Sequence, residues 1–177
     1  AKKLYNSGAD IIKVGIGPGS ICTTRMVAGI GVPQITAVME VSRALKNKNI
    51  KIISDGGIKF SGDIAKAIGA GADAIMMGSI FAGTEESPGK KFKIKNKFYK
   101  QYRGMGSIGA MSAGSSNRYF QKRYQDKSKF VPEGVDGRVK YKGNVSKIIY
   151  QLKGGLKSSM GYIGAKKLND IKKNAKF

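Results

Sequence analysis

The sequence predicts an α/β fold in which helices cover a parallel sheet. Three short apolar runs bounded by turn residues suit buried strands, at residues 10–14, 50–54 and 73–77. Between them, residues 33–47 and 61–69 carry apolar side chains at helical spacing. Strands that are apolar on both faces and alternate with helices are typical of parallel sheets.

Each of these strands is followed by glycines, at residues 15–19, 56–57 and 78–83. Because function in parallel α/β sheets and barrels gathers on the loops that leave the carboxyl ends of the strands, we expect the functional site in these loops.

The helices have recognisable limits. Pro33 suits a first helical turn, Ser61 is the expected N-cap of the second helix, and Gly69 is expected to end it.

After about residue 84 the pattern changes. Basic and apolar residues alternate over 90–99 and predict an exposed hairpin around Asn96. Residues 101–114 are expected to begin as a loop and end in a short helix, and residues 115–140 are expected to form a mobile flap. Two final helices are predicted at 144–153 and 164–175, with Gly154–Gly155 and Gly161–Gly164 as breaks.

The composition excludes several kinds of chemistry. The 177 residues include no histidine and one cysteine, which rules out an intrachain disulfide and Ser-His-Asp or Cys-His catalysis. No apolar run approaches the ~18 residues that a membrane span needs, so we expect a cytoplasmic protein without a membrane partner.

The net charge of +22 permits nucleic-acid binding. The lysines are nevertheless scattered along the whole chain, and we favour a lysine-rich solvated surface over a nucleic-acid site.

Cys22 is open to two interpretations. A lone cysteine is often a small buried hydrophobe, but Cys22 lies in the glycine-rich loop GIGPGSICTTR, beside hydroxyl and basic groups that can stabilise a thiolate. Backbone carbonyls of such a loop can also coordinate a hard cation.

The turns DGGI and MGS, which follow the second and third strands, favour a phosphate site. Glycines let backbone N–H groups approach a phosphate, Ser79 adds a hydroxyl donor, and Asp55 suits ribose hydroxyls. The alternative is that these glycines only form tight turns.

Six motifs occur in order: GIGPGSICTTR, IISDGGI, IMMGSIFAGTEESPG, YRGMGS, RYF and PEGVDGRV. Together they resemble the inosine-5′-monophosphate (IMP) dehydrogenase family. The resemblance implies that residues 1–177 are the C-terminal portion of one catalytic (β/α)₈ TIM-barrel domain. This portion would hold about the last three βα units, a finger hairpin near 90–99, a mobile flap near 115–140 and C-terminal helices. We expect it to be inactive by itself.

The resemblance also implies the roles of individual residues. Cys22 would attack the purine ring to form a covalent thioimidate, with Thr24 near the reacting centre, and Arg118 with Tyr119 would activate water for hydrolysis. The implied substrate-binding residues are Ser20, Asp55, Gly56, Gly57, Gly78, Ser79, Tyr102, Gly104, Met105, Gly106 and Glu133. Gly15, Ile16 and Gly17 would approach NAD, and the carbonyls of Gly17, Gly19 and Cys22 would bind a potassium ion.

The implied reaction is the NAD-dependent oxidation of IMP to xanthosine 5′-monophosphate, carried out by a homotetramer. Two alternatives are weighed against it: a guanosine-monophosphate reductase, which typically lacks the Arg–Tyr flap pair, and a basic nucleic-acid-binding fragment without catalysis.

Overall fold

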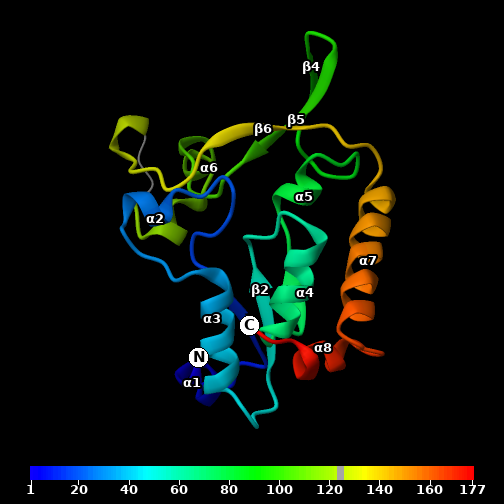
Figure 1. Cartoon of the computed structure of the whole chain (residues 1–177). Helices are drawn as coiled ribbons and strands as arrows, with labels where there is room; N and C mark the ends of the chain where they lie inside the picture. The colour runs from blue at the N-terminus through cyan, green and yellow to red at the C-terminus, as the bar shows by residue number, and fades with distance from the viewer. Residues whose placement is uncertain (123–125) are drawn as a thin grey trace. The chain divides into compact units, whose positions relative to one another are not determined.

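The computed structural model describes residues 1–122 and 126–177. The chain divides into two compact units (Figure 1). Unit 1 comprises Ala1–Pro18, Val32–Met77 and Ser146–Phe177, and unit 2 comprises Gly19–Gly31 and Gly78–Val145.

Unit 1 is built on a parallel sheet with the order β1-β2-β3. The strands are β1 (Ile11–Val14), β2 (Lys51–Asp55) and β3 (Ala74–Met76). Their register places Ile12 beside Ile52 and Ser54 beside Ile75. The three predicted strands and their parallel pairing are confirmed.

Helices α3 (Gln34–Ala44) and α4 (Ser61–Gly69) pack against the sheet of unit 1. A core cluster of apolar side chains lies under α3, where Val38 is completely buried against the strands. The unit also contains α1 (Lys2–Asn6), α8 (Leu168–Asn174) and all but the first residue of α7 (Val145–Tyr162).

The opposite face of this sheet is open. Ile11 is 55% exposed and Met76 50% exposed, although both belong to strands that were expected to be buried on both faces. Lys13 and Asp55 form an ion pair on this same side of the alternating strands. The prediction of burial on both faces is therefore confirmed only for the side that the helices cover.

Several predicted helix boundaries in unit 1 are wrong. The helix predicted over 33–47 ends at Ala44, and Pro33 is its N-cap instead of part of its first turn. Ser61 is the first residue of α4 rather than its N-cap. The exposed first turn is held instead by the Asp63 carboxylate, which accepts hydrogen bonds from the N–H groups of Lys59 (3.0 Å) and Phe60 (2.9 Å). The last helix begins at Leu168 instead of residue 164. The backbone N–H groups of the two residues just before Leu168 donate hydrogen bonds to the Asp170 carboxylate.

The predicted break at Gly154–Gly155 is also wrong, because α7 continues through both glycines. A Cβ added at Gly155 would overlap the side chain of Ser61, whereas one at Gly154 would meet nothing within 4 Å. Gly155 thus allows close packing of α7 against the start of α4, and packing compensates for its low helix propensity.

Unit 2 contains an antiparallel sheet with the order β4-β5-β6. The strands are β4 (Lys91–Ile94), β5 (Lys97–Arg103) and β6 (Asp136–Lys140). The predicted hairpin is confirmed, and its turn contains a positive φ of 50° at Lys95. The prediction that a loop begins at residue 101 is wrong, because β5 continues to Arg103 by pairing with β6.

The remaining elements of unit 2 are short: α2 (Thr24–Val27), α5 (Ser79–Ala82), α6 (Ile108–Ser112) and the 3₁₀ turns η1 (Ser115–Tyr119) and η2 (Lys127–Lys129). The flap predicted near 115–140 contains β6, and its residues 123–125 lie outside the described residues.

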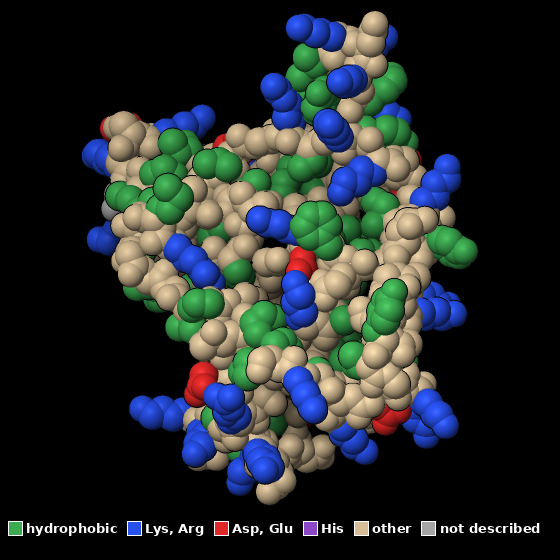
Figure 2. Space-filling model, viewed as in Figure 1, with side chains coloured by type: hydrophobic (Ala, Val, Ile, Leu, Met, Phe, Trp, Pro, Cys, Tyr) green, Lys and Arg blue, Asp and Glu red, His purple; other side chains and the backbone are tan. Residues whose placement is uncertain are grey.

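Lysine and arginine side chains are scattered over the visible face instead of gathering in one stripe (Figure 2). Among the described residues, none of the helices combines the length and apolar character that crossing a membrane requires.

Candidate active site

The cysteine loop of unit 2 is held against a second loop by backbone hydrogen bonds. The N–H of Thr23 donates to the Glu133 carbonyl (2.8 Å), and that of Val135 donates to the Ile21 carbonyl (3.0 Å). Between these two bonds, Cys22 pairs with Gly134 in an isolated antiparallel bridge. Two segments more than a hundred residues apart in sequence therefore fix the backbone of the cysteine.

The Cys22 thiol is half-buried and is not part of a disulfide. Its Sγ lies 3.2 Å from Oγ1 of the buried Thr24 and 3.7 Å from the Glu133 carbonyl oxygen. Either Sγ or Oγ1 can donate in the first contact, so the threonine hydroxyl can also donate to a thiolate. Cys22 is therefore half-buried and hydrogen-bonded, and its roles as a packing residue or a reactive thiol stay predictions.

Tyr119 lies in the same cluster. Burial raises the pKa of its phenol, and the charges of Cys22 and Glu133 raise it further, while the charge and hydrogen bond of Arg118 act in the opposite direction. The net pKa is above the ordinary value of 10.0, so the phenol is a neutral hydrogen-bonding group at neutral pH. Arg118 itself is exposed.

The YRGMGS segment runs beside these groups. Gly104 N–H donates to the Val135 carbonyl (3.0 Å), and Glu133 N–H donates to the Gly106 carbonyl (2.9 Å). A Cβ at Gly106 would lie 2.8 Å from a ring carbon of Tyr119. Gly106 therefore permits the tyrosine ring to lie directly on the backbone of this segment.

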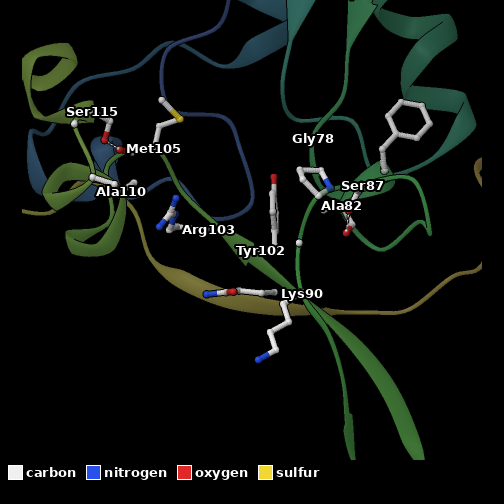
Figure 3. Close-up of a pocket in the computed structure, with 15 residues that line it drawn as sticks. Gly78, Ala82, Ser87, Lys90, Tyr102, Arg103, Met105, Ala110 and Ser115 are labelled. Carbon is white, nitrogen blue, oxygen red and sulfur yellow. Dashed lines mark hydrogen bonds between the residues drawn. The ribbon is translucent and has the colours of Figure 1, made fainter.

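A cavity of about 910 Å³ opens in unit 2 beside the same segment. Figure 3 shows Tyr102 rising from β5 between Arg103 and Met105 on one side and Gly78 and Ser87 on the other. A Cβ at Gly78 would lie 2.7 Å from the Tyr102 hydroxyl, so the hydroxyl lies against the turn that leads into α5. The residues that line the cavity are Gly78, Phe81, Ala82, Ser87, Pro88, Gly89, Lys90, Gln101, Tyr102, Arg103, Met105, Ala110, Ala113, Gly114 and Ser115.

Unit 2 thus contains most of the predicted site residues. They are Gly19, Ser20, Cys22, Thr24, Gly78, Ser79, Tyr102, Gly104, Met105, Gly106, Arg118, Tyr119 and Glu133. The others lie in unit 1: Gly15, Ile16, Gly17, Asp55, Gly56 and Gly57.

In unit 1 the ends of β1 and β2 lie very close together. Gly15 has a φ of 152°, and a Cβ there would overlap the carbonyl oxygen of Asp55. Gly57 has a φ of 79°, which also favours glycine, and the Asp55 carboxylate is paired with Lys13.

Gln34 supports this region, and sequence reasoning missed it. Its side-chain amide donates to the Val14 carbonyl (2.8 Å) and to the Ser54 hydroxyl (3.2 Å), joining the ends of β1 and β2. The only available signal was its place at the start of a helix that follows the cysteine loop.

The described part of the chain holds no group of three or more His, Cys, Asp or Glu side chains that could bind a metal ion. The cation predicted at the cysteine loop would be bound by backbone carbonyls, which are ligands of another kind. The Gly19 carbonyl already accepts from the Cys22 N–H (3.1 Å), and a carbonyl oxygen has a second lone pair for a cation.

Comparison with known proteins shows the family of the chain. The family model described as the IMP dehydrogenase / GMP reductase domain matches residues 1–177. The chain is 58% identical to an inosine-5′-monophosphate dehydrogenase of Methanocaldococcus jannaschii over 183 residues, covering 100% of the chain and 37% of that protein.

Proteins of the same name from Borreliella burgdorferi and Rhizobium tropici are 58% and 57% identical. These alignments cover 100% and 99% of the chain, and 44% and 35% of the two relatives. The chain thus spans less than half the length of these curated relatives. Because the family model matches the whole chain, the chain belongs to the IMP dehydrogenase / GMP reductase family.

Proposed function

We propose that the protein carrying this chain oxidises IMP to xanthosine 5′-monophosphate, with NAD as the hydride acceptor and Cys22 as the nucleophile. The single observation that carries the proposal is the placement of the partly accessible Cys22 thiol. It is hydrogen-bonded to Thr24 and lies in one cluster with Tyr119 and Glu133. The names of the relatives support the choice of reaction.

In the first step, the thiol proton leaves to solvent and the Cys22 sulfur forms a bond to C2 of the purine. Thr24 Oγ1, 3.2 Å from Sγ, donates to the thiolate and holds its direction. The hydride then departs from C2 with its bonding electron pair, and a thioimidate remains on Cys22. Covalent capture divides the oxidation into two easier steps.

In the second step, a water oxygen forms a bond to C2 and the bond between C2 and sulfur breaks. Arg118 and Tyr119 orient and polarise this water, whose proton leaves to solvent, and the departing Cys22 thiolate takes up a proton. The neutral phenol of Tyr119, whose pKa is raised mainly by burial, is suited to hydrogen bonding rather than to ion pairing. The presence of this pair in the same cluster as Cys22 favours the dehydrogenase over the reductase.

Substrate binding is proposed for two groups of residues. In unit 2, Gly78, Ser79 and Tyr102 would hold the phosphate, with Met105 and Glu133 toward the base. Gly78 and Tyr102 already line one cavity, whose volume lies within the range of ligand sites. The roles of Ser20, Gly104 and Gly106 in unit 2, and of Asp55, Gly56 and Gly57 in unit 1, stay predictions.

The cysteine-loop residues fit a cofactor and a cation. Gly17 has a positive φ, which lets a ligand approach the backbone closely, and Ile16 before it is largely exposed. Gly15 packs against the Asp55 carbonyl, and its role toward NAD stays a prediction. NAD bound there supplies the hydride acceptor. Potassium prefers oxygen ligands, and the carbonyls of Gly17, Gly19 and Cys22 are the donors that this loop can offer.

We also propose that β1, β2 and β3 are three strands of a (β/α)₈ barrel. The parallel pairing in sequence order supports this, as does the open sheet face that carries Ile11 and Met76. In the full-length protein, Ile11→Ala should then lower the free energy of unfolding by about 2–5 kcal/mol, as for a core residue. A change below about 0.5 kcal/mol, typical of surface positions, would contradict the barrel. The homotetramer and the cytoplasmic location stay predictions.

The reaction is tested in the full-length protein with Cys22→Ala and Cys22→Ser. Wild type mixed with IMP and NAD should form NADH and a covalent adduct on Cys22 that mass spectrometry detects. Cys22→Ala should lose both by at least about 10³-fold while its melting temperature stays unchanged. NADH formation at the wild-type rate in Cys22→Ala would exclude the proposed nucleophile.

A further inference from the structure

The ammonium of Lys100 is buried in unit 2. Among the described residues, it forms no hydrogen bond or ion pair with a carboxylate. Lys100 is 4% exposed, the lowest exposure of any charged residue described. Its Nζ donates to the carbonyls of Thr84 (2.8 Å), Glu85 (3.1 Å) and Ser87. An ammonium has three protons to donate, so these carbonyls satisfy it completely.

The carbonyls belong to one tight segment, residues 80–87, which we call the anchor segment. A second lysine binds it as well, because Lys142 Nζ donates to the Ile80 carbonyl (3.0 Å). Two further carbonyls of the segment accept hydrogen bonds from hydroxyl groups. Thr84 Oγ1 donates to the Phe81 carbonyl (2.8 Å), and Ser87 Oγ donates to the Ala82 carbonyl (2.7 Å). These side chains add to the backbone hydrogen bonds from Lys142 N–H to the Gly83 carbonyl (2.8 Å) and from Glu85 N–H to the Gly143 carbonyl (2.9 Å), which also hold the segment.

Lys100 connects the two walls of the cavity. The anchor segment begins directly after Gly78–Ser79 and ends in Ser87, which with Pro88 and Gly89 lines the cavity. Lys100 itself lies on β5, where Gln101, Tyr102 and Arg103 line the opposite wall. The same β5 brings the Tyr102 hydroxyl against Gly78 (Figure 3).

A hydrogen-bonded cation suits this position better than an apolar side chain. If the ammonium were removed, the partly buried carbonyls of Glu85 and Ser87 would lose this partner, and the buried carbonyl of Thr84 would keep only the longer hydrogen bond from the Ser87 N–H (3.3 Å). The segment would have to open toward water to recover those hydrogen bonds, and Gly78–Ser79 would move with it.

We infer that Lys100 is a positioning residue that fixes the Gly78–Ser79 phosphate turn relative to Tyr102. It acts through the anchor segment, without touching the substrate. The inference rests on the proposed function for its ligand, a nucleoside monophosphate. It goes beyond that function because it makes a buried cation responsible for the position of the Gly78–Ser79 turn.

The experiment uses the full-length protein and compares Lys100→Met with Lys97→Met. Methionine keeps an unbranched side chain without the charge, and Lys97 is an exposed lysine on the same strand. Lys100→Met should raise the KM for IMP and the Kd for IMP by about tenfold, with kcat changed by less than about threefold. Amide hydrogen exchange at 84–90 should become at least about tenfold faster. Lys97→Met should change none of these.

A chemical rescue provides a readout that a merely structural role would not give. In Lys100→Ala, added n-propylammonium should restore IMP affinity in a saturable way, while tetramethylammonium, which has no N–H group, should not. If Lys100 variants fail to fold, Lys142→Met decides, because Lys142 is exposed and its removal leaves no cavity. It should raise the Kd for IMP by about threefold.

Unchanged IMP affinity in Lys100→Met, or in Lys142→Met where the former does not fold, overturns the inference, as does unchanged exchange at 84–90. A wild type that does not bind IMP overturns the proposed function instead. Exchange at 84–90 and the affinity for inorganic phosphate then test the anchoring independently. In Lys100→Met, faster amide exchange at 84–90 together with a lower affinity for inorganic phosphate supports the anchoring. If either the exchange rate or the phosphate affinity is unchanged, the anchoring is rejected.

Discussion

Units 1 and 2 differ in what holds their buried parts together. Unit 1 has a cluster of aliphatic side chains between α3 and the parallel strands, with Val38 and Ala72 fully buried. Unit 2 contains five of the six buried polar or charged residues described, Thr24, Thr84, Lys100, Ser107 and Ser116. Apolar burial is non-directional, whereas hydrogen bonds fix both distance and angle.

The comparison teaches where precision is needed. The reactive cluster around Cys22 requires directed contacts, and it lies in the unit that hydrogen bonds organise. Substitutions in unit 2 should therefore alter chemistry more than stability, and substitutions in unit 1 should do the reverse. Four predictions test this division, all in the full-length protein.

The largest expected effect is on hydrolysis in unit 2. Arg118→Ala should leave the first burst of NADH intact and slow steady-state turnover by roughly 10²–10⁴-fold, the range for loss of acid–base assistance. Rapid-mixing absorbance at 340 nm measures both phases. Lys97→Ala, which removes one exposed positive charge from the same unit, should behave as wild type. Loss of the burst with normal steady-state hydrolysis would contradict the assigned role.

The next effect concerns the core of unit 1. Ile52 is 5% exposed, and Ile52→Ala should lower the free energy of unfolding by about 2–5 kcal/mol, because it removes buried methyl groups and leaves a cavity. Turnover per folded molecule should change little. Urea unfolding compares it with Ile149→Ala, on the half-exposed side of α7. Equal destabilisation by both variants would count against an apolar core as the basis of this unit.

Two adjacent glycines of α7 give a smaller, signed effect. Gly155→Ala should lower the free energy of unfolding by about 1–3 kcal/mol, since the new methyl group overlaps the Ser61 side chain. Gly154→Ala meets no atom within 4 Å and should raise it by about 0.5–1 kcal/mol through helix propensity. Thermal melts of both variants measure the difference. The same sign for the two would refute the close packing of α7 on α4.

The smallest effect is a pH dependence in unit 1. Burial raises the pKa of Asp73, but hydrogen bonds from Lys172 and Ile52 N–H, with nearby lysine charges, lower it below 3.8 overall. Because the folded-state pKa is depressed, the Asp73 carboxylate stabilises the fold above the unfolded value and loses this contribution as pH falls through the folded pKa.

Asp73→Asn should therefore lower the free energy of unfolding at pH 7 by about 0.5–1 kcal/mol, and this loss should be smaller at about pH 2 than at pH 7. Urea unfolding at both pH values measures this. Glu40→Gln, which removes an exposed i,i+3 pair with Arg43, is the control and should have a smaller effect. A loss for Asp73→Asn that persists undiminished at low pH would argue against an ion-pair origin.

The sequence by itself determined the parallel βα units and the hairpin. Apolar runs such as 50–54, helical spacing between them and glycines after each strand are local signals, and the structure confirms the elements that they predict. The motifs also pointed to the family that the comparisons show. Local order of this kind follows from residue types and their period, which are written in consecutive positions.

Only the tertiary structure decided the contacts between distant segments. The pairing of β6 with β5, the continuity of α7 through Gly155 and the burial of Lys100 each depend on a partner far away in sequence. The same holds for Cys22, whose environment includes Glu133 as well as its neighbour Thr24. A residue's partners across the fold are not encoded in its local pattern, because hydrogen bonds and packing depend on three-dimensional distance.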